Sequence, residues 1–258
     1  MEFINYTSYD KAEDIKRLKF ISNNLPSNNG ESLNILEIGC GNGNISYQLA
    51  RNGHHVTGID ICQTTINTAN EKFGDTLGLQ FKVVNAELLT SGENEKYDVI
   101  VCSEVLEHLH HPDKLVSNFK NLLNKDGLAL VTVPNGFGPR EIFITKPIIK
   151  VNTSNGVVSK VINKIKLLLG YKGDTQQTSA EYLDHIQFFT IKKLEKLADT
   201  GGFVISKKGS GNFIETVFPF SLLTRRLFFL QQLDCFIADL LPISFCSIFY
   251  SVWNQKDK

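Results

Sequence analysis

The sequence predicts an α/β fold in which a mostly parallel sheet is doubly wound, with helices on both faces. Three observations support this prediction. Short apolar stretches alternate with helix-like segments, a glycine-rich turn follows the first apolar stretch, and the chain is long enough for one sizeable core. With 258 residues, of which 42% are hydrophobic, we expect residues 1–258 to form a single elaborated domain.

The first half of the chain alternates between expected helices and expected strands. A helix over 9–25 has Ile15, Leu18 and Ile21 on one apolar face. It is followed by strands at 33–39, 54–60, 79–86, 97–103 and 128–134, with helices at 44–52, 63–73 and 113–123. A turn at 125–127 is expected before the fifth strand. Parallel sheets of this kind bind ligands at the carboxyl ends of their strands, so we expect the functional site at that edge.

The second half departs from this alternation. Residues 136–185 are interpreted as a helical insertion after the fifth strand, acting as a lid or substrate segment, and 157–172 within it combines an apolar stripe with lysines. Such a helix suits a lid over an acceptor pocket, a membrane surface or a partner protein. The chain then resumes with the elements expected at 190–200 (helix), 203–209 (strand), 210–245 (apolar helical insertion) and 246–254 (last strand). We expect the apolar insertion to cover the sheet or the lid.

Composition and charge narrow the classes of function. Lysine plus arginine equals aspartate plus glutamate at 27 each, whereas a protein that holds nucleic-acid phosphates usually carries a basic excess. The five cysteines show no paired spacing, which favours a reducing compartment, and the N-terminus has no apolar signal core. Asp234, Asp239 and Pro242 interrupt the apolar stretch 225–252, which is therefore not a spanning helix. We expect a cytoplasmic protein that binds no nucleic acid, and peripheral contact with a membrane stays open.

A glycine-rich turn joins the first expected strand to its helix. In "LEIGCGNGN", the glycines permit positive φ and close approach of a ligand to the backbone, and the next helix offers unpaired N–H groups. The spacing G-x-G-x-G departs from the dinucleotide fingerprint, whose last glycine position holds Asn44 here. Asp60, at the end of the second strand, can accept both hydroxyls of a ribose, and Asn85-Ala86-Glu87 can contact an adenine edge. Together these features predict a nucleoside ligand.

Several stretches resemble class I S-adenosylmethionine-dependent methyltransferases. "ILEIGCGNGNISYQLARNGHHVTGID" is similar to motif I of that family and the strand after it. The resemblance continues through "YDVIVCSEVLEHL", "LNKDGLALVTVPN" and "DHIQFFTIKKLEKLADTGGFVI", and covers about 33–135 and 181–206. It implies a Rossmann-like fold with seven strands, of which the last is antiparallel, and S-adenosylmethionine as the cofactor.

The resemblance also implies which residues bind that cofactor. The expected contacts are Glu37 (amino group), Gly39, Gly41 and Gly43 (methionine part), Asp60 (ribose hydroxyls), Asn85, Ala86 and Glu87 (adenine) and Ser103 (sulfonium side). Many relatives carry Asp where this chain has Asn85, so this contact keeps a carbonyl acceptor but loses the charge.

The stretch "SEVLEHLHH" places carboxylates and imidazoles directly after the fourth strand. Glu104, Glu107 and His108 are spaced i, i+3 and i+4, and would share one face of a helix. Two carboxylates and an imidazole can bind Mg²⁺ or a similar cation. His185, after the insertion, can return to the site as a further ligand or a general base. His108 and His185 are therefore the candidate catalytic residues.

The pattern Glu-x-x-Glu-His resembles the metal-binding motif of ubiquinone-biosynthesis O-methyltransferases and of small-RNA 2′-O-methyltransferases. The alternative is that the same side chains only brace the pocket wall, as in methyltransferases for which no metal is implied. His110 and His111 precede Pro112, are expected to cap the next helix, and receive no chemical role.

These features lead to one functional hypothesis with two alternatives. A sulfonium is an activated methyl donor, so the protein must align the acceptor with it and remove a proton from a hydroxyl acceptor. We expect an S-adenosylmethionine-dependent O-methyltransferase acting on a small-molecule or lipid-linked acceptor, such as a sugar or a quinone precursor, with Asn135 and Arg140 as candidates for acceptor contact. The alternatives are a metal-dependent RNA 2′-O-methyltransferase and a non-catalytic nucleoside-binding protein.

Overall fold

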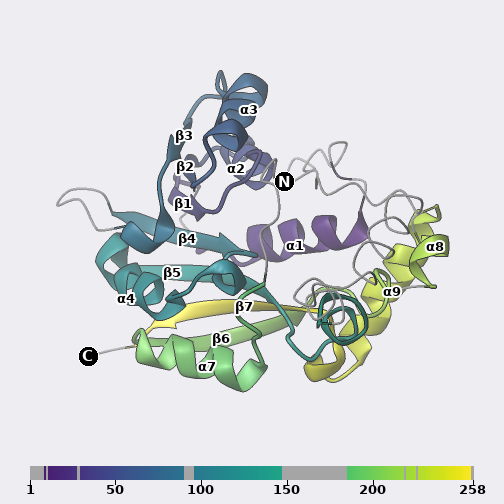
Figure 1. Cartoon of the computed structure of the whole chain (residues 1–258). Helices are drawn as coiled ribbons and strands as arrows, with labels where there is room; N and C mark the ends of the chain where they lie inside the picture. Colours follow the sequence, from purple (N-terminus) through teal and green to yellow (C-terminus); the bar gives the residue numbers. More distant parts are fainter. Residues whose placement is uncertain are drawn as a thin grey trace, which may run out of the picture.

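The described structure is organised around one seven-stranded sheet (Figure 1). The computed structural model describes residues 9, 11–27, 30–89, 96–146, 185–217, 219–224 and 226–256. The strands are β1 (Asn34–Ile38), β2 (His55–Asp60), β3 (Leu79–Val83), β4 (Tyr97–Ser103), β5 (Leu123–Pro134), β6 (Phe203–Ser210) and β7 (Ile248–Gln255). Their order is β3-β2-β1-β4-β5-β7-β6, and β1 to β5 pair in parallel. β7 is antiparallel to both β5 and β6, which confirms the predicted fold class and the antiparallel last strand.

Helices cover both faces of this sheet. The described helices are α1 (Ala12–Asn23), α2 (Asn44–Arg51), α3 (Gln63–Phe73), α4 (Pro112–Leu122), α7 (Ile191–Thr200), α8 (Ser221–Thr224) and α9 (Phe228–Leu240), of which α8 contacts α9 rather than the sheet. α4 and α7 bury their apolar sides on one face, around Phe119, Phe203 and Trp253. α1 and α2 cover the other face, where Ile21 and Leu49 pack on the strands. The burial of both faces explains why the central strands β1, β4 and the second part of β5 are mostly apolar.

Two segments around β4 differ from the sequence prediction. β5 begins at Leu123, so the predicted turn at 125–127 lies inside the strand. A register shift between Tyr97 and Val99 absorbs these residues, and Asn124 Nδ2 donates to Asp98 Oδ1 at 2.7 Å across the shift. After β4, the chain forms only the single 3₁₀ turn η3 (Leu106–His108), because Glu104 takes a left-handed conformation that does not belong to a helix.

The insertion predicted at 136–185 is described only at its two ends. It begins with the π-helical turn η4 (Glu141–Thr145) and rejoins the described chain at His185. The stretch 147–184, which includes the lysine-bearing segment 157–172, lies outside the described residues. The two ends meet, because Gly136 N donates to Phe189 O at 2.7 Å.

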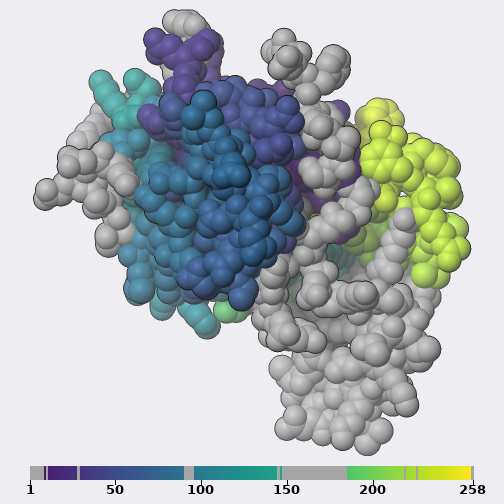
Figure 2. Space-filling model, turned by 90° about the horizontal axis from the view of Figure 1, so that it is seen from above, coloured from purple at the N-terminus to yellow at the C-terminus, as the bar shows by residue number. Residues whose placement is uncertain are grey.

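The apolar insertion predicted at 210–245 contains α8, α9 and the 3₁₀ turn η5 (Ile243–Phe245). α9 packs on α1 and also touches β6. In Figure 2, α8 and its surroundings (yellow-green) lie at one margin of the molecule, away from the blue half that carries α3. Many of the apolar side chains of this insertion are exposed rather than buried against the sheet as expected. Among the described helices, none is both long and apolar enough to cross a membrane.

Candidate active site

The glycine turn after β1 has the shape of a ligand cradle. Gly41 and Gly43 have φ of 53° and 80°, values that side chains rarely adopt. A Cβ on Gly43 would lie 2.5 Å from Phe81 Cζ, so this position has no room for a side chain. Gly43 is also the N-cap of α2 and has no side chain with which to cap it. The N–H of Ser46 is bonded to Glu37, and the positive end of the helix dipole at this N-terminus favours a negatively charged ligand group.

Asp60 lies at the carboxyl end of β2, beside that cradle. Its Oδ2 accepts from Gly41 N at 3.1 Å and its Oδ1 accepts from Cys62 N at 2.8 Å. These two bonds fix the carboxylate next to the glycine turn. Its side chain remains partly exposed and can accept further hydrogen bonds from a ribose.

Glu37 lies beneath the cradle and is 2% exposed. The Ser46 hydroxyl donates to its carboxylate. Burial raises the pKa of Glu37 to about 8, and the nearby charge of Asp60 adds to this shift. A cationic group placed here would lower that pKa again.

The expected adenine contacts after β3 hold the local loops together. Asn85 Oδ1 accepts from Glu87 N at 2.9 Å, which starts the 3₁₀ turn η2 (Ala86–Leu88). Glu87 Oε1 accepts from His110 N at 2.9 Å and from His111 N at 3.2 Å. Glu87 therefore ties the end of β3 to the loop after β4. Their role toward an adenine stays a prediction.

Ser103 and Glu104, at the end of β4, meet on Thr132 of β5. The Ser103 and Thr132 hydroxyl oxygens are 2.9 Å apart, and the Thr132 hydroxyl donates to Glu104 Oε1 at 3.0 Å. Glu104 N also donates to Thr132 O at 3.0 Å. Its carboxylate is thereby held against β5.

Glu107, His108 and His185 form a compact polar cluster. One ligand atom from each lies within 4.8 Å of the others. His108 Nε2 is 3.6 Å from Glu107 Oε1, and the two imidazole rings are 5.1 Å apart between centroids. The cluster spans the insertion, because Ile186 N and Gln187 N both donate to Glu107 O, at 2.8 and 2.9 Å. The structure thus brings His185 to the predicted Glu-x-x-Glu-His segment.

Glu107 is the most constrained member of the cluster. It is 1% exposed, and within the described residues neither carboxylate oxygen takes part in a hydrogen bond. Burial, and then the charge of Glu104, raise the pKa of Glu107 well above its usual range. A buried carboxyl without hydrogen bonds is costly unless a cation or a ligand completes its surroundings.

One carboxylate and two imidazoles are donors that suit a metal ion. The three groups, with Glu107 orphaned among them, fit a zinc, manganese or similar first-row ion. Mg²⁺ fits less well, since it prefers oxygen ligands. Glu104 is not part of this compact set, which replaces the expected trio of Glu104, Glu107 and His108 with one that includes His185.

Sequence reasoning missed Glu141 and misread Asn135. Glu141 is 1% exposed in η4, and its Oε1 lies 3.2 Å from His185 Nδ1. No spacing in the sequence marks it, because the contact joins the two ends of the insertion. Asn135, a candidate acceptor contact, is buried, and its Nδ2 donates to Ser244 O and Cys246 O at 2.8 and 2.7 Å. It therefore anchors the chain before β7.

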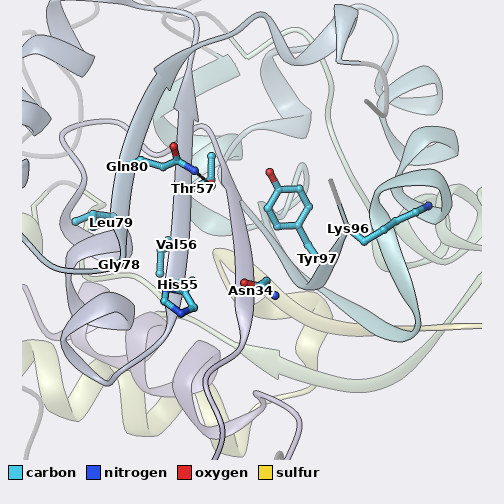
Figure 3. A pocket seen from close by; sticks show the side chains of 9 residues that line it. All are labelled: Asn34, His55, Val56, Thr57, Gly78, Leu79, Gln80, Lys96 and Tyr97. Carbon is cyan, nitrogen blue, oxygen red and sulfur yellow. Dashed lines mark hydrogen bonds between the residues drawn. The ribbon is translucent and has the colours of Figure 1, made fainter. Parts of the chain in front are cut away.

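A cavity of about 500 Å³ lies at the opposite, amino-terminal edge of the sheet (Figure 3). Its walls come from the starts of β1 to β4: Asn34, His55, Val56, Thr57, Gly78, Leu79, Gln80, Lys96 and Tyr97. Gln80 Nε2 donates to Thr57 Oγ1 at 2.8 Å within it. Parallel sheets of this type bind their ligands at the other edge, so this cavity is separate from the site described above.

The sheet order, the glycine cradle with Asp60 and the polar cluster after β4 define a class I S-adenosylmethionine-dependent methyltransferase. A family profile described as "Methyltransferase domain" matches residues 6–208. The chain belongs to this methyltransferase family.

Known relatives and solved structures are consistent with that membership. The ubiquinone biosynthesis O-methyltransferase of Rickettsia canadensis is 31% identical over 121 residues, which is 46% of this chain and 51% of that protein. The chain thus spans about half the length of the curated relatives it matches. An S-adenosylmethionine-dependent methyltransferase from Mesorhizobium loti has a TM-score of 0.58 at 14% identity, over 95% of this chain and 99% of that one.

A second solved structure is the 1,6-didemethyltoxoflavin-N1-methyltransferase of Burkholderia thailandensis, with its substrate and S-adenosylhomocysteine bound. It has a TM-score of 0.56 at 15% identity, over 96% of this chain and 80% of that one. At these identities the two solved structures show the fold alone.

Proposed function

We propose that this protein transfers a methyl group from S-adenosylmethionine to an oxygen of a small or lipid-linked acceptor, such as a quinone precursor or a sugar. One observation carries the proposal. A Cβ on Gly39 would overlap the side chain of Val105, so the glycine turn lies directly against the segment that holds Glu107 and His108. Cofactor cradle and polar cluster therefore share one edge of the sheet, as donor and acceptor sites must.

The residues of the cradle supply binding. Asp60 is placed to accept ribose hydroxyls, and Glu37 offers a buried carboxylate to the amino group of the cofactor. The bound sulfonium supplies an activated methyl group, so the remaining tasks are alignment of the acceptor and removal of its proton.

The histidine pair suits the second task. His185 lies beside Glu141 and His108, in a cluster that stays partly open to solvent through its imidazoles. A carboxylate at 3.2 Å can hold the imidazole in one orientation, which a general base for a hydroxyl requires. The name of the curated relatives, ubiquinone biosynthesis O-methyltransferase, supports oxygen as the acceptor atom.

A metal-assisted form of the same reaction is the second candidate, and Glu107 favours it. Its carboxyl is buried beside two imidazoles without a hydrogen bond among the described residues. A first-row ion held by Glu107, His108 and His185 would bind adjacent oxygens of an acceptor and lower the pKa of its hydroxyl.

The proposal is tested by binding and turnover. Isothermal titration should show binding of S-adenosylhomocysteine, and labelled cofactor should methylate at least one member of a panel of catechols, hydroxyquinones, lipid-linked sugars and RNA termini. Lack of cofactor binding would remove the proposal. Tight binding without turnover on any acceptor would favour a non-catalytic protein, and turnover on RNA alone would replace the acceptor class.

The metal is tested separately. Glu107→Gln and His185→Ala should lower the content of bound zinc or manganese, measured by mass spectrometry of dialysed protein. His110→Ala is the matched control, because His110 is exposed and uses only its backbone N in the contacts described. Activity insensitive to EDTA with no bound metal would leave His185 as a general base alone. In that case His185→Ala should still reduce turnover about a hundredfold or more.

A further inference from the structure

Helix α9 directs apolar side chains toward solvent, the reverse of the usual arrangement for a helix at the surface of a protein. Most of its exposed positions are large and apolar: Phe228, Phe229, Leu233, Phe236, Ile237 and Leu240. Phe229 and Phe236 are each 60% exposed. A surface helix normally presents its polar face to solvent and its apolar stripe to the core. We call this surface of α9, with its apolar neighbours on and beside α8 and on η5, the α8–α9 face; those neighbours are Phe220, Leu222, Leu223, Leu227 and Phe245.

Two polar residues of α9, Gln231 and Asp234, are buried and form hydrogen bonds with the rest of the fold. Gln231 Oε1 accepts from Ala12 N at 3.0 Å, and its Nε2 donates to Thr224 O at 2.9 Å. Asp234 accepts from Phe213 N and Ile214 N at 2.8 and 3.0 Å. These bonds fix the orientation of α9 toward α1 and the chain after β6. The outward position of its apolar side chains is therefore built into the fold.

A surface with so many exposed large apolar side chains marks an interaction site, since monomeric soluble proteins rarely expose large contiguous apolar patches. We propose that the α8–α9 face docks on the surface of a lipid bilayer. α9 has 13 residues, too few to cross a membrane, and is suited to lie in the interface with its apolar side among the acyl chains.

The composition of the face favours lipid over a protein partner. An interface between proteins carries about ten direct hydrogen bonds, with polar groups around its rim. Few exposed side chains of the described residues 219–245 can form one, and they are Arg226, Gln232, Asp239 and Ser244. A bilayer needs no matched hydrogen bonds from the protein.

The charge of the face also suits a bilayer. Asp239 is neutralised by Lys16, at 2.7 Å, whereas Arg226 is exposed on the face. Within the described residues of 219–245, the exposed acid is thus compensated and a cation remains for anionic headgroups.

Position links the face to the candidate active site. η5 ends the face, and the backbone oxygens of Ser244, within η5, and of Cys246, directly after it, accept from Nδ2 of Asn135, which follows β5. Docking there would bring the acceptor edge of the sheet next to the membrane. This link rests on the proposed function, and it makes a lipid-dissolved acceptor the natural substrate class.

Vesicle flotation tests the docking. Wild-type protein should float with vesicles of phosphatidylcholine and phosphatidylglycerol, and Phe229→Glu/Phe236→Glu should lower the partition coefficient roughly tenfold or more. Leu77→Glu is the matched control, since Leu77 is 93% exposed and lies before β3, in the other half of the sheet. Equal melting temperatures would show that all variants fold.

Three results would overturn the inference. They are wild-type protein that stays unbound, a double variant that binds as well as wild type, and a face-dependent dimer in ultracentrifugation that ignores vesicles. Titration with S-adenosylhomocysteine separates the two proposals: retained cofactor binding without vesicle binding removes only the docking, and the reverse removes only the methyl transfer.

Discussion

Glu104 is a residue whose backbone conformation needs an explanation. Among the described residues other than glycine, Glu104 is the one whose φ is positive, at 56°. It stands where β4 gives way to η3, and Thr132 holds both its backbone N–H and its carboxylate. Strained backbone of this kind is often kept at functional sites, and here it redirects the chain so that Glu107 turns inward.

This strain predicts an unusual order of stability between two variants. Glu104→Gly should be more stable than Glu104→Ala by about 1 kcal/mol, because glycine tolerates positive φ without steric cost. Both variants lose the same carboxylate, so urea denaturation compares only the backbone. Equal stability, or an advantage for alanine, would contradict the left-handed conformation.

Glu37 predicts that cofactor binding is linked to pH. Its pKa is about 8 in the free protein because of burial, so the carboxyl is largely protonated at pH 7. A bound ammonium group would lower that pKa, and a proton would then be released on binding. The affinity for S-adenosylhomocysteine should therefore rise with pH up to about 8 and level off above it.

Titration calorimetry in buffers of different ionisation enthalpy measures the released proton directly. Glu37→Gln keeps an oxygen acceptor for Ser46 but cannot ionise, and it should remove the release. If wild type and variant release the same number of protons, the linkage belongs to another group.

At the scale of elements, the attachment of α9 to the rest of the fold depends on Asp234. The Asp234 carboxylate satisfies two backbone N–H groups of the segment after β6 and is 6% exposed. Asp234→Ala should lower the free energy of unfolding by roughly 1–3 kcal/mol, because those donors lose their partner. Gln232→Ala, two residues away on the exposed side of the same helix, should change it by less than about 0.5 kcal/mol. Comparable losses in the two variants would mean that Asp234 does not anchor the helix.

The elements themselves were largely predictable from the sequence. Apolar stretches and helical periodicity located β1, β2, β4, α2 and α3 to within a residue or two at each end. The turn at 125–127 was wrong, because Leu123 already pairs with β4 and the unpaired residues that follow it form an irregular part of β5. The outward face of α9 was also missed, since periodicity reveals an apolar stripe but not the direction in which it points.

At the scale of the whole molecule, Trp253 reports on the sheet. It is the single tryptophan and is 0% exposed. Its ring lies near Phe119 of α4 and Phe203 of β6, in the core between the sheet and α4. Its fluorescence should change in one step with denaturant, coincident with the loss of helix measured by circular dichroism, because all seven strands share one sheet. Separate transitions would show that the β5–β7 side unfolds independently of the cofactor side.

The candidate site could be predicted only where local sequence carries the signal. The glycine turn, Asp60 and the Glu-x-x-Glu-His pattern each follow a strand, and the sheet brings strand ends together. The partnership of Glu107 with His185, and of His185 with Glu141, arises from contacts across an insertion. Such contacts produce no recognisable spacing in the sequence, because they depend on how the two ends of the insertion meet.

The outward phenylalanines of α9 have a practical consequence for work with this protein in water. The sequence isoelectric point is about 7.0, so near neutral pH the molecules do not repel one another. Electrostatic repulsion then does not oppose the attraction between apolar faces. Association of the protein should therefore be strongest in the near-neutral buffers most often chosen for purification. Working away from neutrality, or with mild detergent micelles that shield the face, should keep concentrated samples monodisperse.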